Sequence, residues 1–76
     1  MNKEKIIKRA SEILGIAEND ESLSSCLEMV LNENYGLQLT DEAWAYGLIE
    51  AYAFCAGLFG VWTVYLKKFN EAKGGK

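Results

Sequence analysis

Apolar residues recur at steps of three and four along most of the chain, which is the spacing of one face of an α-helix. The first pattern is formed by Ile6, Ile7, Ala10, Ile13 and Leu14. It predicts a helix over residues 3–14, capped by Asn2 and closed by Gly15. The second pattern predicts a helix over residues 22–35, with Asp20 or Ser22 as its cap; its apolar face is made by Leu23, Cys26, Leu27, Val30, Leu31 and Tyr35.

The third pattern, from Ala43 to Leu66, is the longest and contains a single charged residue, Glu50. Thr40 is placed to cap a helix there, so we expect one long helix over residues 41–71. On such a helix, one face carries the bulky residues Trp44, Leu48, Tyr52, Cys55, Phe59, Trp62, Leu66 and Phe69. The opposite face is mostly small, with Ala45, Ile49, Ala53, Ala56, Gly60, Thr63 and Val64. A second helix or water could approach that small face.

These patterns predict an all-α fold in one small domain over residues 1–76. Two short amphipathic helices, 3–14 and 22–35, would pack on one long apolar C-terminal helix. At about 1.5 Å per residue, the long helix would extend roughly 45 Å and the second helix only about 20 Å. The short helices would therefore cover only the first half of the long one.

The uncovered half predicts an interface, because a monomer does not leave a large aromatic patch in water. We expect the contact residues to be Leu58, Phe59, Trp62, Tyr65 and Leu66. The simplest partner is a second copy in a symmetric homodimer. If the chain were a monomer, the long helix would have to fold back or break near Gly57 or Gly60.

A lipid bilayer is the alternative partner for the same stretch. Residues 43–66 are long enough to span a membrane, with aromatic residues near both ends and Lys67 and Lys68 directly after them. In that case the protein would be a single-pass membrane protein, or a small subunit of a membrane complex, with its C-terminus in the cytoplasm. Glu50 opposes this alternative, since a carboxylate near the bilayer centre costs about 2.5 kcal/mol or more.

Composition narrows the class of partner. The chain has 76 residues, is 50% hydrophobic and has no proline, which is typical of a folded domain. Its net charge of −3 argues against a nucleic-acid partner, because phosphate contacts need a clustered basic surface. An acidic surface would suit a small regulator or inhibitor that binds a basic protein.

The side chains that carry out chemistry are few. With two cysteines and no histidine, the chain offers no metal site, no cofactor site and no activated nucleophile, so we expect a protein that is not an enzyme. Cys26 and Cys55 are interpreted as buried free thiols in the cytoplasm, too far apart for a disulfide. Glu50 is either a carboxylate used to move protons or bind a cation, or a residue at the edge of the apolar face that reaches water or a lysine of the first helix.

Overall fold

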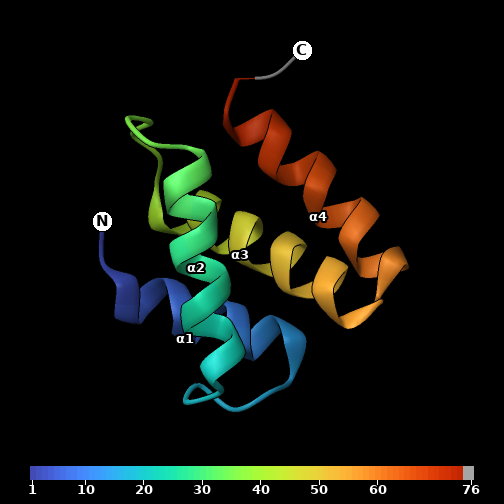
Figure 1. Ribbon diagram of the computed structural model, residues 1–76. Coiled ribbons are helices and arrows are strands. Elements are labelled where there is room, and N and C mark those ends of the chain that lie inside the picture. Colours follow the sequence, from blue (N-terminus) through green and yellow to red (C-terminus); the bar gives the residue numbers. More distant parts are fainter. Residues whose placement is uncertain (75–76) are drawn as a thin grey trace.

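The structure is a computed structural model that describes residues 1–74, and it is all-helical. Residues 75 and 76, which belong to the expected domain, lie outside the described residues. Four helices follow in order: α1 (Lys3–Leu14), α2 (Glu21–Glu33), α3 (Asp41–Ala56) and α4 (Phe59–Ala72) (Figure 1). The all-α class is therefore confirmed. The expected arrangement of three helices with one long C-terminal helix is wrong, because the long segment is divided into α3 and α4.

The first three helices begin at the side chains that the sequence indicates as caps. Asn2, Asp20 and Thr40 each accept a hydrogen bond from a backbone N–H in the first turn of α1, α2 and α3, at 3.2, 2.9 and 3.1 Å. Such a bond satisfies one of the N–H groups that a helix start leaves without a partner. These helix starts are therefore fixed by local chemistry.

The long apolar segment breaks at Gly57, one of the two glycines that the sequence offers for a break. Gly57 has a φ of 76°, in the left-handed region that glycine enters without steric cost. The N–H of Leu58 donates to the carbonyl of Ala53 at 2.8 Å, and the N–H of Gly57 donates to Phe54 at 3.2 Å. This pair of bonds is the Schellman motif that closes many helices. Gly60 instead lies inside α4.

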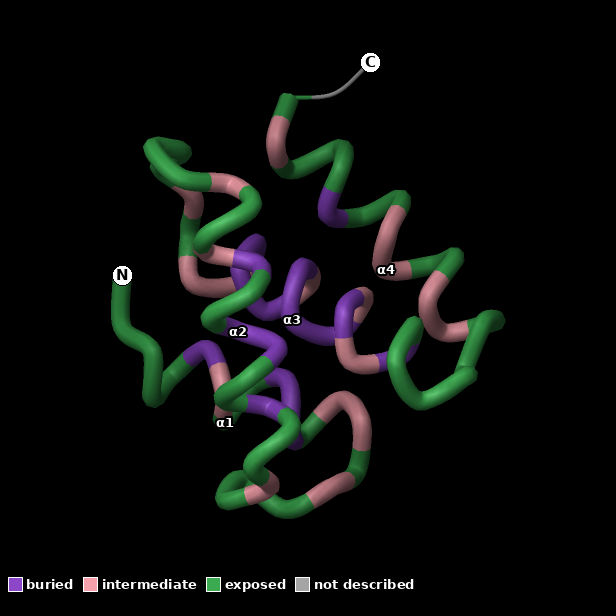
Figure 2. Tube along the Cα trace, in the orientation of Figure 1, coloured by how far each residue is buried: buried purple, intermediate pink, exposed green. Residues whose placement is uncertain are grey.

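Helix α3 is central, since it packs against each of the other three helices (Figure 1). Figure 2 shows buried positions along most of α3 and on the inner faces of α1 and α2. Ala45, Ile49 and Ala53, which lie on the face that was expected to be mostly small, are as fully buried as Leu48. The two expected faces of this segment are therefore both covered, which explains why α3 is apolar nearly all round.

Helix α4 folds back along α3 and covers the side that carries Tyr46, Gly47 and Glu50. Close approach is possible because Gly47 has no side chain: a Cβ there would lie 2.7 Å from the ring of Phe69. That ring also packs on Trp44, with centroids 6.1 Å apart. Part of the apolar surface that we expected a partner to cover is thus covered by the chain itself.

Candidate functional site

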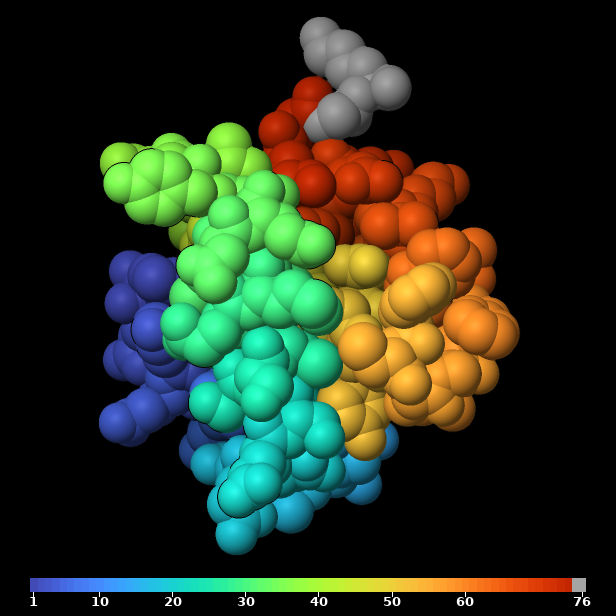
Figure 3. All heavy atoms as spheres, in the orientation of Figure 1, coloured from blue at the N-terminus to red at the C-terminus, as the bar shows by residue number. Residues whose placement is uncertain are grey.

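An exposed aromatic cluster lies where α3 turns into α4, and we call it the aromatic corner: Phe54, Leu58, Phe59 and Trp62. Phe54, Leu58 and Phe59 are 54%, 45% and 57% exposed. The ring of Phe54 lies 6.1 Å from Phe59 and 5.3 Å from Trp62, and Phe59 lies 6.3 Å from Trp62. In Figure 3 this turn forms an outer edge of the molecule, in orange. Large apolar side chains are thus gathered where solvent reaches them.

The structure places three of the five expected contact residues at this corner, and two of these three are exposed. Leu58 and Phe59 are exposed, whereas Trp62 is half-buried beneath them. Tyr65 instead packs within the chain, with its ring 5.8 Å from Tyr46. Leu66 is half-buried and lies seven residues after Phe59, on the same side of α4. Folding α4 back therefore separates Tyr65 from the other expected residues.

Phe54 is a member of the corner that the sequence pattern did not single out. On an unbroken helix, five residues turn the chain by about 500°, so Phe54 and Phe59 would point about 140° apart. The break at Gly57 removes that constraint and brings the two rings to 6.1 Å. Phe54 could have been identified only by assuming a break at Gly57.

Glu50 lies under the corner and accepts a hydrogen bond from the indole Nε1 of Trp62 at 3.2 Å. Desolvation by burial raises the pKa of Glu50; the hydrogen bond from Trp62 opposes that rise, and nearby Glu33 adds to it. The expected contact with a lysine of the first helix is not formed among the described residues. The carboxylate therefore holds Trp62 in position at the base of the corner.

The start of α4 is built without a polar cap. Leu58 occupies the position before the helix, and it makes no side-chain hydrogen bond to the first turn. Ser, Thr, Asp and Asn are the residues preferred there, as the other three helices illustrate. An exposed leucine at this position gives up a stabilising hydrogen bond.

The two cysteines differ in their surroundings. Cys26 on α2 is buried, and burial is the main cause that raises its pKa to about 11, followed by the neighbouring thiol of Cys55. Cys55 is exposed near the end of α3, so the prediction that both thiols are buried is wrong. Both cysteines are free thiols in residues 1–74. The predicted distance between the two thiols assumed that α2 runs antiparallel beside α3. In the structure, α2 crosses α3 steeply (Figure 1).

Residues 1–74 contain neither a cluster of metal ligands nor a helix that could span a membrane. Residues 1–74 hold no group of three potential metal ligands. None of the helices in this range combines the length and the apolar character needed to cross a bilayer. The expected span, residues 43–66, is instead divided between α3 and α4 at Gly57.

Comparisons with protein-family models, with curated proteins and with solved structures find no match to this chain. No residue role is therefore transferred from a relative. The aromatic corner is interpreted from its own geometry and from the charges around it.

Proposed function

We propose that this protein is a small helical interaction protein that forms a homodimer through the aromatic corner and acts by binding, not by catalysis. The observation that carries the proposal is the exposure of Phe54, Leu58 and Phe59, at 54%, 45% and 57%, in one contiguous group with Trp62. Exposed aromatic groups of this kind are enriched at the centres of protein interfaces. Isolated exposed apolar residues would need no explanation, but a cluster does.

A second copy is the partner that the charges favour. The chain has a net charge of −3, yet residues 51–66 contain no charged side chain. Two corners can therefore meet without placing like charges opposite one another. A two-fold axis through the corner would pair Phe54 and Phe59 of one copy with the same residues of the other, which is the usual isologous geometry.

The uncapped start of α4 supports the same proposal. Replacing a good capping residue by an aliphatic one typically costs about 1 kcal/mol of stability. Leu58 makes no capping hydrogen bond, so the start of α4 lacks that stabilisation. The leucine side chain is 45% exposed, so packing within the monomer offsets little of the loss. Contact with a partner gives this leucine a role. Residues that lower the stability of the local structure are common at functional sites.

The test is the substitution Leu58→Asp, examined by size exclusion with light scattering across a range of protein concentrations. Asp is a preferred capping residue, so we expect α4 and the thermal stability of the monomer to be retained or improved. A charge at the corner should nevertheless dissociate the dimer. We expect the wild-type chain to have the mass of a dimer and the variant that of a monomer.

Val64→Asp is the matched control. Val64 is 52% exposed on α4, and it lies five residues after Phe59, about 140° round the helix from it. Val and Asp have similar helix propensities, so this variant adds the same charge outside the corner with little change in helix stability. We expect it to remain dimeric. A wild-type chain that is monomeric at every concentration, or a Val64→Asp variant that dissociates as Leu58→Asp does, would overturn the proposal.

A further inference from the structure

Glu50 is the only charged side chain between Ala43 and Leu66, and it lies at the base of the aromatic corner. Its Oε1 accepts a hydrogen bond from Nε1 of Trp62 at 3.2 Å. The ring of Trp62 in turn packs on Phe54, with centroids 5.3 Å apart. A single side chain therefore separates this carboxylate from the exposed aromatic rings of the corner.

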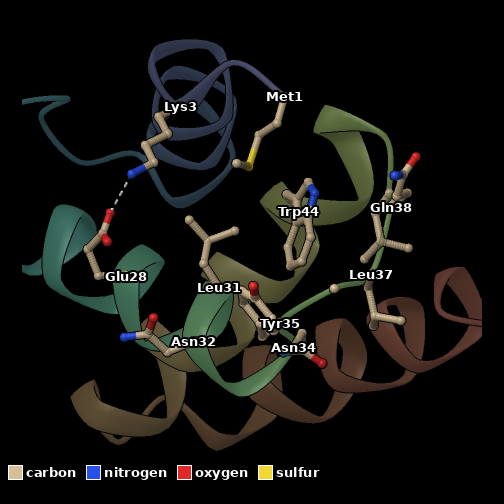
Figure 4. A pocket seen from close by; sticks show the side chains of 12 residues that line it. Met1, Lys3, Glu28, Leu31, Asn32, Asn34, Tyr35, Leu37, Gln38 and Trp44 are labelled. Atoms are coloured by element: carbon tan, nitrogen blue, oxygen red, sulfur yellow. Dashed lines mark hydrogen bonds and ion pairs between the residues drawn. The ribbon is translucent and has the colours of Figure 1, made fainter.

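The groups around Glu50 provide only a partial counter-charge. On α2, Glu33 repels the carboxylate, and the Cys26 thiol is uncharged at neutral pH because burial raises its pKa to about 11. On α4, Lys73 attracts the carboxylate, but its Nζ also donates a hydrogen bond to Asn34 at 3.3 Å. Residues 1–74 form two ion pairs that do not include Glu50: Lys3 with Glu28 (Figure 4) and Arg9 with Glu42. Water therefore contributes to stabilising the ionised form of Glu50.

A second copy on the corner would remove part of that water. Glu50 and Trp62 are both half-buried in a single copy. Because Trp62 belongs to the corner, a partner that covers the corner dehydrates the indole and the carboxylate bonded to it. Dehydration disfavours the ionised carboxyl group, so the pKa of Glu50, which burial already raises in one copy, rises further in the dimer. The protonated group still accepts a hydrogen bond through its carbonyl oxygen.

On the basis of the dimer proposed above, we propose that each copy takes up a proton at Glu50 when two corners meet, so that mildly acidic solution strengthens the dimer. A group whose pKa is higher in the dimer favours association fully below the monomer value, and this contribution is lost as pH rises through the dimer value. Residues 51–66 contain no Asp, Glu or His. Glu50 is therefore the side chain at the corner whose charge changes between pH 5 and pH 8.

Analytical ultracentrifugation of the full chain measures the dissociation constant of the dimer at pH 5 and pH 8. We expect the wild-type constant to rise at least tenfold between these pH values, which is about threefold for each of the two Glu50 carboxylates. Glu50→Gln is neutral at both pH values and keeps an acceptor for Trp62. Its constant should change less than threefold and stay near the wild-type value at pH 5.

Glu12→Gln is the matched control. Glu12 is exposed on α1, outside the corner, and its substitution removes the same charge. We expect this variant to weaken at least tenfold between pH 5 and pH 8, as wild type does. A wild-type change below threefold, or an equal change in wild type and Glu50→Gln, would overturn proton uptake while leaving the dimer in place. A wild-type chain that is monomeric at both pH values would overturn the dimer as well.

The Nε1–H signal of Trp62 gives a direct readout, because its hydrogen bond partner is the group that titrates. The signal is assigned by NMR of the ¹⁵N-labelled chain with the variant Trp62→Phe. We expect it to titrate at a higher pH in a concentrated, dimeric sample than in a dilute, monomeric one. The same midpoint in both samples would show that association does not change the protonation of Glu50, and would overturn the proposal.

Discussion

The two halves of the long apolar stretch have similar composition and different surroundings. In residues 43–53, α1 and α2 cover one side of α3 and α4 covers another, so that Ala45, Leu48 and Ile49 are fully buried. Residues 54–66 include three exposed large side chains, Phe54, Leu58 and Phe59. The number of neighbouring helices, and not the apolar character of the segment, decides which half is core. An apolar sequence shows what needs covering, but not what covers it.

The largest expected effect compares two phenylalanines of the same helix. Phe69 is 2% exposed between Gly47 and Trp44, whereas Phe59 is exposed at the corner. Phe69→Ala should lower the free energy of unfolding by about 3–5 kcal/mol, because it leaves a cavity between α3 and α4. Phe59→Ala should change the stability of the monomer by less than about 0.5 kcal/mol.

Urea unfolding followed by circular dichroism measures both variants, at one low protein concentration so that association contributes little. Losses of similar size in Phe69→Ala and Phe59→Ala would contradict the assignment of Phe69 to the core and of Phe59 to the exposed corner. Such a result would show instead that Phe59 is buried within the monomer.

A smaller effect concerns the break that separates the halves. Gly57 has a φ of 76°, so Gly57→Ala should cost about 1–2 kcal/mol. Gly60 lies in an ordinary helical turn with open space where a Cβ would go, so Gly60→Ala should gain about 0.5–1 kcal/mol. Thermal unfolding of both variants tests the position of the break. Stabilisation by Gly57→Ala would instead favour one continuous helix.

The smallest effect concerns Glu50, which lies at the boundary between the halves. Burial raises the pKa of Glu50 in the folded state, so its contribution to stability is fully present below the unfolded pKa of about 4.3 and is lost as pH rises through the folded value. Glu50→Gln removes the charge and keeps an acceptor for Trp62. It should therefore be modestly more stable than wild type at pH 7.

The difference between Glu50→Gln and wild type should disappear near pH 3, where the carboxyl group is protonated in both states. Thermal unfolding across this pH range measures the difference. A variant that is less stable than wild type at neutral pH would show that the ionised carboxylate is favourable beneath Trp62, against the cost of burying it.

The sequence by itself determined the all-α class and the starts of three helices. Asn2, Asp20 and Thr40 act on backbone groups a few residues away, so their effect is readable from local order. The candidate corner was foreseen in part: the pattern identified Leu58, Phe59 and Trp62 as needing cover, and it named Gly57 and Gly60 as possible breaks.

Tertiary structure decided whether and where the long segment turns back. A continuous helix gains backbone hydrogen bonds at Gly57, whereas a break lets Phe69 reach Gly47 and Trp44 and lets Trp62 reach Glu50. That choice depends on contacts between residues 12 to 25 positions apart, which a pattern with a period of 3.6 does not contain. The break at Gly57 also brought Phe54 to Phe59, and the return of α4 along α3 packed Tyr65 on Tyr46. Local chemistry thus specified the helices, and packing over longer separations specified which apolar residues remain available to a partner.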